Sequence, residues 1–263
     1  MTPFVTAALL GFAATLVLAL GTWVASLVQR DVSLVDRMWS LLIAAPAVAY
    51  AWVLVPGDDL RFKVMAALLV VWAVRLAVYV SWRNWGHGED RRYTVIRARN
   101  EPHFALKSVY LIFVLQAVLA WLVSLPFLAA AAHPVAWTVL DTVGALLAAI
   151  GFVFEALGDQ QLASFKGDPA NRGQVMDRGV WRYSRHPNYF GEFCVWWGLF
   201  LMALTAGGWW SVISPLIMTG LLLKVSGVAL LEKDIGDRRP AYRDYIARTN
   251  AFFPGPPRRK PVR

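Results

Sequence analysis

The sequence predicts an all-α integral membrane protein, a polytopic bundle of about seven transmembrane helices. Of the 263 residues, 58% are hydrophobic and only 16% are charged, and the apolar residues gather into long stretches. A hydrocarbon core of roughly 30 Å needs about 20 apolar residues per helix. Leucine, alanine and valine fill the stretches without the polar and apolar alternation of barrel strands, so helices are expected.

Each long apolar stretch gives one expected span. The first has no basic residue before it and no small-residue cleavage site, so we expect a retained helix and not a signal peptide. The later stretches are separated by charged or turn-forming segments. Without an internal repeat, they form one expected membrane domain over 1–263. The expected spans are 4–28, 38–55, 62–82, 108–131, 134–157, 188–206 and 209–232.

Basic residues mark alternate connections, and this pattern predicts the orientation. The links near His133 and Gly207 carry no lysine or arginine, whereas the tail after residue 232 carries nine. The positive-inside rule therefore places the amino terminus outside and the carboxyl terminus in the cytoplasm. Two further basic connections contain Arg83, Arg91, Arg92, Arg97, Arg99 and Lys107, and Lys166, Arg172, Arg178, Arg182 and Arg185.

The charge and cysteine content argue against two other classes of protein. The net charge of +9 does not indicate nucleic-acid binding, because the basic residues lie between or after apolar stretches, where they suit anionic lipid headgroups or a phosphate-bearing ligand. The single Cys194 and four scattered histidines offer no zinc-type cluster. We therefore expect membrane lipid as a partner, no nucleic acid, and no metal.

Several ionisable residues fall within or at the edge of the expected spans, where a charge costs at least about 2.5 kcal/mol. Arg75 and Tyr79 are four residues apart, as are Glu155 and Asp159, so each pair shares one helix face. The expected topology places Tyr79, Glu155, Asp159 and Glu192 in the cytoplasmic halves of their spans. Glu155 and Asp159 could instead be struts that pair helices. The same structural reading is preferred for Asp141 and Lys224, which are left out of the site.

One segment of the sequence indicates a binding site for an anionic cofactor. Residues 177–192 read D-R-G-V-W-R-Y-S-R-H-P-N-Y-F-G-E, a basic aromatic loop that leads into a span. Gly179 permits a tight turn, Arg182 and Arg185 can grip phosphate, and Pro187 suits a first helical turn. Aromatic side chains in the loop could stack on a flat ring. An interfacial belt of arginine and aromatic residues is the alternative, but it requires neither Asn188 nor Glu192.

This segment resembles the carboxyl-terminal region of the steroid 5-alpha-reductase superfamily, most closely its bacterial branch, DUF1295. The region that resembles this carboxyl-terminal part covers about 108–253. The resemblance is strongest over 155–253. It implies a membrane bundle that holds NADPH in a cytoplasmic cavity and passes hydride to an activated carbon-carbon double bond. The branch also implies a bacterial inner membrane.

The resemblance assigns site residues position by position. The cofactor-contacting asparagine and the acid of the P-N-[YF]-x-G-E element fall on Asn188 and Glu192, and the tail L-L-E-K-D-I-G-D-R-R-P-A-Y-R-D-Y resembles the final cytoplasmic helix. Glu232 and Tyr245 are expected cavity or cap residues of that helix. The cofactor-binding residues expected in all are Arg75, Glu155, Asp159, Arg178, Arg182, Tyr183, Arg185, Asn188, Glu192, Arg239 and Tyr242.

The substrate side departs from the steroid reductases. Their glutamine-glutamate pair in the second span is replaced here by residues around Asp36, and Trp72 stands near their substrate-binding tyrosine. A steroid is therefore not specified, although a lipophilic conjugated carbonyl is expected. Hydride addition builds negative charge on the carbonyl oxygen, which a hydroxyl or protonated carboxyl must stabilise. Tyr79 and Asp36 are the catalytic candidates.

Two other functions stay open. Isoprenylcysteine carboxyl methyltransferases, which use S-adenosylmethionine, share a Y-x-x-x-R-H-P-x-Y-x-G core that this chain has in slightly shifted form. They usually lack the asparagine and glutamate of N-Y-F-G-E, and they carry two consecutive glutamates where this chain has Glu232 and Lys233. A lipid-binding or transport role is the third reading, although no repeat or discontinuous helix suggests a transporter. The arginine-rich loops favour NADPH, with its several phosphates.

Overall fold

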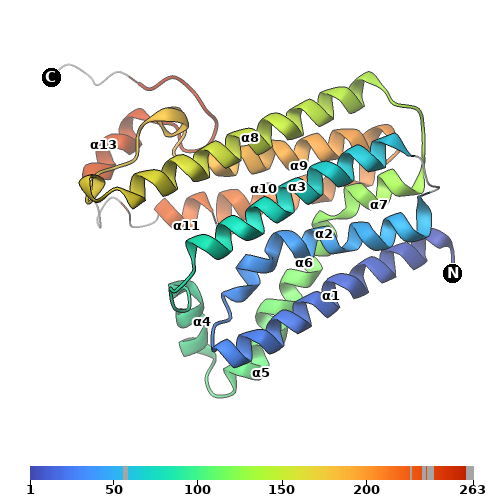
Figure 1. The fold of residues 1–263 in the computed structure, drawn as a ribbon, viewed down its shortest axis with the longest axis horizontal. Coiled ribbons are helices and arrows are strands. Elements are labelled where there is room, and N and C mark those ends of the chain that lie inside the picture. Colours follow the sequence, from blue (N-terminus) through green and yellow to red (C-terminus); the bar gives the residue numbers. More distant parts are fainter. Residues whose placement is uncertain (56–58, 226, 233–234, 236–239, 259–263) are drawn as a thin grey trace. The chain divides into compact units, whose positions relative to one another are not determined.

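The computed structural model describes residues 1–55, 59–225, 227–232, 235 and 240–258. Among them all regular structure is helical and no strand is formed, as expected. The helices are drawn in Figure 1. The chain divides into two compact units. Unit 1 comprises Met1–Asp141 and Met202–Ser214, and unit 2 comprises Thr142–Leu201 and Pro215–Arg263. Two units of one chain are compatible with the single membrane domain expected over 1–263, which stays a prediction.

Within the described residues, five helices are long and apolar enough to cross a membrane, as in a multi-pass membrane protein. The fourth, Phe104–Ala132, is a succession of shorter elements: α5 (Phe104–Ser108), the π-helix η1 (Val109–Val114), α6 (Leu115–Val123) and α7 (Leu125–Ala132). The break before α7 falls at Pro126, whose ring cannot continue the preceding helix. The other four are α1 (Pro3–Gln29), α2 (Leu34–Leu54), α3 (Leu60–Arg83) and α8 (Val139–Gly167).

The last two expected spans are shorter or broken. Residues 188–206 correspond to α9 (Pro187–Thr205), and 209–225 form a shorter apolar succession. That succession comprises η4 (Trp209–Val212), α10 (Ile213–Gly220) and the π-helix η5 (Leu221–Val225), and α11 (Val228–Glu232) follows. The count of seven spans and the orientation of the termini therefore stay predictions.

Small residues let the helices of unit 1 approach closely. α1 packs on α2 and α6, and α2 also contacts α3 and α7. The buried face of α1 repeats every third or fourth residue and is made of Ala7, Gly11, Thr15, Ala19, Thr22 and Ser26. At Gly11 a Cβ atom would lie 2.4 Å from the ring of Tyr50, whose hydroxyl is 3.0 Å from the Ser124 hydroxyl. Small interfacial residues of this kind are typical of membrane helix pairs.

A buried ion pair ties α3 to the start of α8 within unit 1. Arg61 donates from Nε and Nη2 to the two carboxylate oxygens of Asp141, at 2.6 and 2.9 Å, and both side chains are buried. The hydroxyl of Thr205 also donates to Asp141, at 2.9 Å. Thr138 and Asp141 form a reciprocal capping box, which explains why α8 begins at Val139 and not at 134. Asp141 is thus structural, as expected.

Helices α8 and α9 pack through glycine in unit 2. A Cβ atom at Gly191 would lie 2.4 Å from the Glu155 nitrogen and 2.5 Å from the Gly151 carbonyl oxygen. A Cβ atom at Gly198 would lie 2.5 Å from the Gly144 carbonyl oxygen. Because these neighbours are backbone atoms, they cannot move aside without separating the helices. Glycine is therefore required at Gly191 and Gly198 for the observed approach.

Besides α8, α9 and the helical elements between 215 and 232, unit 2 contains a loop and a tail. Two 3-10 turns, η2 (Pro169–Asn171) and η3 (Gly179–Arg182), lie between α8 and α9. The helix α13 (Ala241–Arg248) precedes the terminal segment, and α4 (Arg91–Asn100) is the corresponding short polar helix of unit 1. Of the expected site residues, the loop and α13 carry Arg178, Arg182, Tyr183, Arg185 and Tyr242.

The glycine contact between α8 and α9 yields a first test. Gly191→Ala should lower the thermal unfolding midpoint of the detergent-purified protein, because overpacking a close backbone contact costs roughly 1–3 kcal/mol. The matched control is Gly220→Ala, since no described atom lies within 4 Å of a Cβ at that position. Alanine there should be neutral or stabilising. Equal midpoints for Gly191→Ala and the wild type would contradict the observed approach.

Candidate functional site

The centre of the candidate site is a contact between α8 and α9 in unit 2. The Asn188 side-chain amide donates to Asp159 Oδ1 at 3.0 Å. Asn188 lies in the first turn of α9, which begins at Pro187 as the sequence predicts. The helices come this close because Gly158 faces Asn188: a Cβ atom at Gly158 would lie 3.0 Å from the Asn188 nitrogen. One hydrogen bond thus joins two residues that the resemblance assigned to cofactor binding.

Three buried carboxylates gather on these two helices. Glu155, Asp159 and Glu192 are 2%, 4% and 8% exposed. Glu155 lies one turn before Asp159, and Glu192 one turn after Asn188, so they share the facing sides of α8 and α9. Buried carboxylates are stable only where donors surround them. Each of the three has an interaction within the chain, and because a carboxylate accepts several hydrogen bonds, the same groups also suit ligand donors such as ribose hydroxyls, carboxamides or a cation.

The loop before α9 presents exposed basic and aromatic side chains. Gly179 has φ +56°, a left-handed conformation that glycine adopts without strain, and it confirms the expected turn. The turn is fixed by two hydrogen bonds to α8: from the Val180 amide to Gln161 Oε1 at 3.0 Å, and from the Trp181 indole to the Gly158 carbonyl at 2.9 Å. Arg178, Arg182 and Tyr183 are exposed on this fixed loop.

Arg185 has a different position from the other arginines of the loop. It is buried, and its guanidinium donates to both carboxylate oxygens of Glu232, at 2.7 and 2.8 Å. Nη1 donates to the carbonyls of Ile246, at 3.2 Å, and Thr249. Each guanidinium nitrogen thus already has a protein acceptor. The phosphate contact expected of Arg185 stays a prediction, and this geometry favours a structural role.

Residues 250–252 of the terminal segment, called the strap below, lie along the loop and are hydrogen-bonded to it. Successive carbonyls of this segment accept from the loop: Asn250 from the Arg185 amide, Ala251 from His186 Nδ1 at 2.9 Å, and Phe252 from the Ser184 hydroxyl at 2.8 Å. Since a carbonyl only accepts, Nδ1 of His186 carries a proton. Burial lowers the pKa of His186, although the Ala251 carbonyl and the Glu232 charge oppose this shift.

Helix α13 is also hydrogen-bonded to the loop. The Tyr245 hydroxyl donates to the carbonyls of Trp181 and, at 3.2 Å, Ser184. Burial raises the pKa of Tyr245, so its hydroxyl stays protonated. Tyr242 packs edge-on against Tyr245, with ring centroids 5.2 Å apart. Arg239, also expected at the site, lies outside the described residues.

In unit 1 the expected pair Arg75 and Tyr79 does share one face of α3. The Arg75 guanidinium carbon lies 5.2 Å from the Tyr79 ring centroid, and that of Arg83 lies 5.6 Å from the same centroid. Cations over an aromatic face are attracted to the ring. Tyr79 is thus flanked by two positive charges, which would stabilise a negative charge close to its hydroxyl.

The other catalytic candidate, Asp36, is part of a polar network. Its Oδ1 accepts from the Tyr93 hydroxyl and its Oδ2 from Arg92 Nη2, both at 2.7 Å. Gln116 donates to the Tyr93 hydroxyl at 3.3 Å. Burial, then the charge of Asp36, raises the pKa of Tyr93, which therefore stays protonated. Both carboxylate oxygens of Asp36 thus accept hydrogen bonds within the protein, so the geometry favours Tyr79 over Asp36 as the donor to a substrate.

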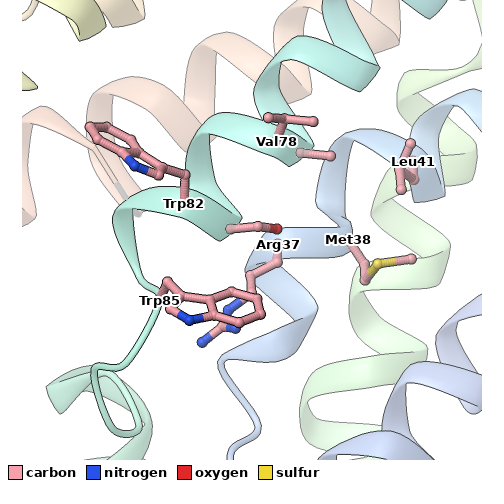
Figure 2. Close-up of a pocket in the computed structure, with 8 residues that line it drawn as sticks. Arg37, Met38, Leu41, Val78, Trp82 and Trp85 are labelled. Carbon is pink, nitrogen blue, oxygen red and sulfur yellow. The ribbon is translucent and has the colours of Figure 1, made fainter.

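Unit 1 also contains a groove of about 410 Å³ between α2 and α3 (Figure 2). Arg37 lies at one end, and exposed indoles of Trp82 and Trp85 lie along the α3 side. The remaining lining residues are Met38, Leu41, Ala77, Val78 and Ser81. None of the expected site residues lines this groove.

The sequence did not single out the contacts that hold the loop. Ser184 and His186 lie within the quoted motif, but their acceptors are backbone carbonyls of the tail, which no side-chain pattern reveals. Gln161 was missed as well, although it lies two residues after Asp159 on α8. In the described part of the chain no three His, Cys, Asp or Glu side chains are placed to hold a metal ion.

Comparison with known proteins places the chain in a family. Residues 22–249 match the family described as "Protein of unknown function (DUF1295)". The chain belongs to the DUF1295 family. An uncharacterized protein of Schizosaccharomyces pombe is 27% identical to this DUF1295 protein over 281 aligned positions, which cover 96% of this chain and 80% of the relative. No solved structure matches the chain.

The buried Arg185 contact yields a second test in this DUF1295 protein. Arg185→Ala would remove the guanidinium donors to Glu232 and to the carbonyls of Ile246 and Thr249, and breaking a buried pair in this way costs roughly 3–5 kcal/mol. The thermal midpoint should fall and the tail should become sensitive to limited proteolysis. Arg182→Ala is the matched control, because Arg182 is exposed and has no side-chain hydrogen bond within the described residues. Identical behaviour of the two variants would contradict a structural role for the buried Arg185 guanidinium.

Burial of His186 predicts a pH dependence of stability. The folded protein binds the second ring proton of His186 more weakly than the unfolded chain does, in which the pKa of this histidine is near 6.5. Stability should therefore rise with pH between the lowered pKa and about 6.5, and level off above it. His186→Gln should flatten the change in thermal midpoint between pH 5.5 and 7.5. A slope equal to that of the wild type would show that other groups set the pH response.

Proposed function

We propose that this protein is an NADPH-dependent membrane reductase of a conjugated carbon-carbon double bond in a lipophilic substrate. The observation that carries the proposal is the Asn188–Asp159 hydrogen bond at the start of α9, beside buried Glu155 and Glu192. These are the positions that the resemblance to the steroid 5-alpha-reductase superfamily assigns to the cofactor. The wider superfamily and its bacterial branch are part of the proposal.

The residues fit the two kinds of polar group that NADPH carries. Its phosphates require donors, and exposed Arg178 and Arg182 offer guanidinium groups on a loop already fixed by hydrogen bonds. Its ribose hydroxyls and carboxamide require acceptors, which the buried carboxylates of α8 and α9 supply. Tyr183 is 45% exposed and offers a face for stacking. Arg75, Arg239 and Tyr242 are proposed as cofactor contacts from the resemblance alone.

NADPH supplies the hydride when bound. The protein's own task is then to stabilise the negative charge that develops on the substrate carbonyl oxygen. Tyr79 is the proposed donor, because the guanidinium groups of Arg75 and Arg83 favour negative charge near its hydroxyl. Asp36 is retained as a positioning group through Tyr93 and Arg92. The substrate is proposed to enter from the bilayer as a lipophilic molecule of small size.

The same proposal includes a topology. Seven spans are obtained if α9 and the 209–232 segment cross the membrane along with the five longer helices. The distribution of lysine and arginine then favours an external amino terminus and a cytoplasmic carboxyl terminus, in a bacterial inner membrane. This arrangement would give the basic loops access to a soluble cofactor.

A methyltransferase that uses S-adenosylmethionine is the second candidate, and one observation favours it. Three buried carboxylates would attract a sulfonium or ammonium cation, and one loop arginine, Arg185, is already engaged by Glu232. Against it, S-adenosylmethionine carries one carboxylate and has no use for two exposed arginines. We therefore rank the reductase first.

A binding experiment decides between these candidates. Detergent-purified protein should be stabilised against heat more by NADPH than by NADH, and more by either than by S-adenosylmethionine. Arg182→Ala should weaken NADPH binding about tenfold or more, because a hydrogen bond to a charged group contributes roughly 1.5–3 kcal/mol. Its affinity for S-adenosylmethionine should not change.

The control is Arg172→Ala, which removes an exposed arginine from the same connection without touching the 177–186 loop. Its NADPH affinity should equal that of the wild type. Stabilisation by S-adenosylmethionine without any response to NADPH would replace the reductase by the methyltransferase. Indifference to all three molecules would reject both and leave a lipid-binding role.

A further inference from the structure

The groove between α2 and α3 has the composition of a lipid site. Its walls are mostly apolar, and Arg37 is the charged residue that lines it. Trp82 and Trp85 are 64% and 77% exposed beside it. A groove with apolar walls and a guanidinium at one end suits an amphipathic ligand whose polar group is negative.

Arg37 is weakly engaged for an arginine at a helix start. Nη2 reaches the Asp31 carboxylate and the Asn84 carbonyl, both at 3.4 Å, which is long for a charged hydrogen bond. Nε is buried, and no acceptor among the described residues lies within hydrogen-bonding distance of it. A modest rotation of the guanidinium would therefore improve its hydrogen bonding if an anionic group were present.

The groove also lies at the ends of two helices that are long and apolar enough to cross a membrane. Arg37 belongs to the first turns of α2, and Trp82 to the last turn of α3, with Trp85 just after it. Tryptophan and arginine at the ends of spans mark the headgroup level on either side of a bilayer. This placement does not depend on which side faces the cytoplasm.

We propose that the α2–α3 groove binds one anionic phospholipid, with its phosphate on Arg37 and the upper part of one acyl chain against Leu41 and Val78. Basic pockets between membrane helices are known sites for anionic headgroups. A choline headgroup should bind more weakly than an anionic one, because the two indoles point in different directions and form no aromatic cage (Figure 2). The lipid site is independent of the reductase proposal.

Native mass spectrometry of the delipidated, detergent-purified full chain tests this site. Titration with phosphatidylglycerol and with phosphatidylcholine of identical acyl chains gives the apparent Kd of the first lipid bound. The wild type should prefer phosphatidylglycerol about fivefold, the effect expected of one basic residue near the surface. Arg37→Gln should abolish that preference, and Arg37→Lys should retain most of it.

Two further arms separate this site from general surface charge. Arg30→Gln removes an exposed arginine from the neighbouring α1–α2 connection and should keep the fivefold preference. Ala77→Phe, which fills the groove, should weaken binding of both lipids several-fold, whereas inorganic phosphate should not displace either. Equal affinity of the wild type for the two lipids, equal losses in Arg30→Gln and Arg37→Gln, or displacement by phosphate would each overturn the proposal.

Discussion

The close approach of α8 and α9 is the constraint on which the candidate site depends. Gly151 and Gly191 allow backbone to meet backbone in the middle of the pair, and Gly158 allows the start of α9 to reach α8. Only at that separation does the Asn188 amide reach Asp159. The same approach buries Glu155 beside its neighbours, because larger side chains would have opened a gap. The helix packing thus creates a concentrated set of acceptors.

The loop next to this helix pair divides its basic residues into two groups. Arg185 is buried and completes a network with Glu232 and the carbonyls of the tail, whereas Arg178 and Arg182 stay exposed. A guanidinium that is saturated by the protein stabilises the fold, and one that faces water is available to a ligand. Hydrogen bonds to α8 and Tyr245 fix the backbone before Arg182, and the strap fixes it after Arg182, so little backbone freedom is left to lose on binding.

In unit 1, charged side chains lie within an apolar helix bundle, where an unpaired charge is costly. Arg61 and Asp141 neutralise each other where both are buried, and Thr138 and Thr205 complete their hydrogen bonding. Asp36 is likewise satisfied by Arg92 and Tyr93. Arg37 is the exception, since its acceptors are distant and one donor has none among the described residues. A weakly satisfied arginine beside an apolar groove is what distinguishes the proposed lipid site from the structural ion pairs.

The sequence alone determined the helical class and most helix positions, because long apolar runs have no other stable form in a bilayer. It also located the turn at Gly179, the start of α9 at Pro187 and the shared face of Arg75 and Tyr79, which are local features set by residue type and spacing. The tertiary structure decided which polar groups are hydrogen-bonded within the protein and which face the solvent. Arg182 and Arg185 look alike in the sequence, yet only Arg185 meets Glu232 and the tail, because that contact joins residues far apart along the chain.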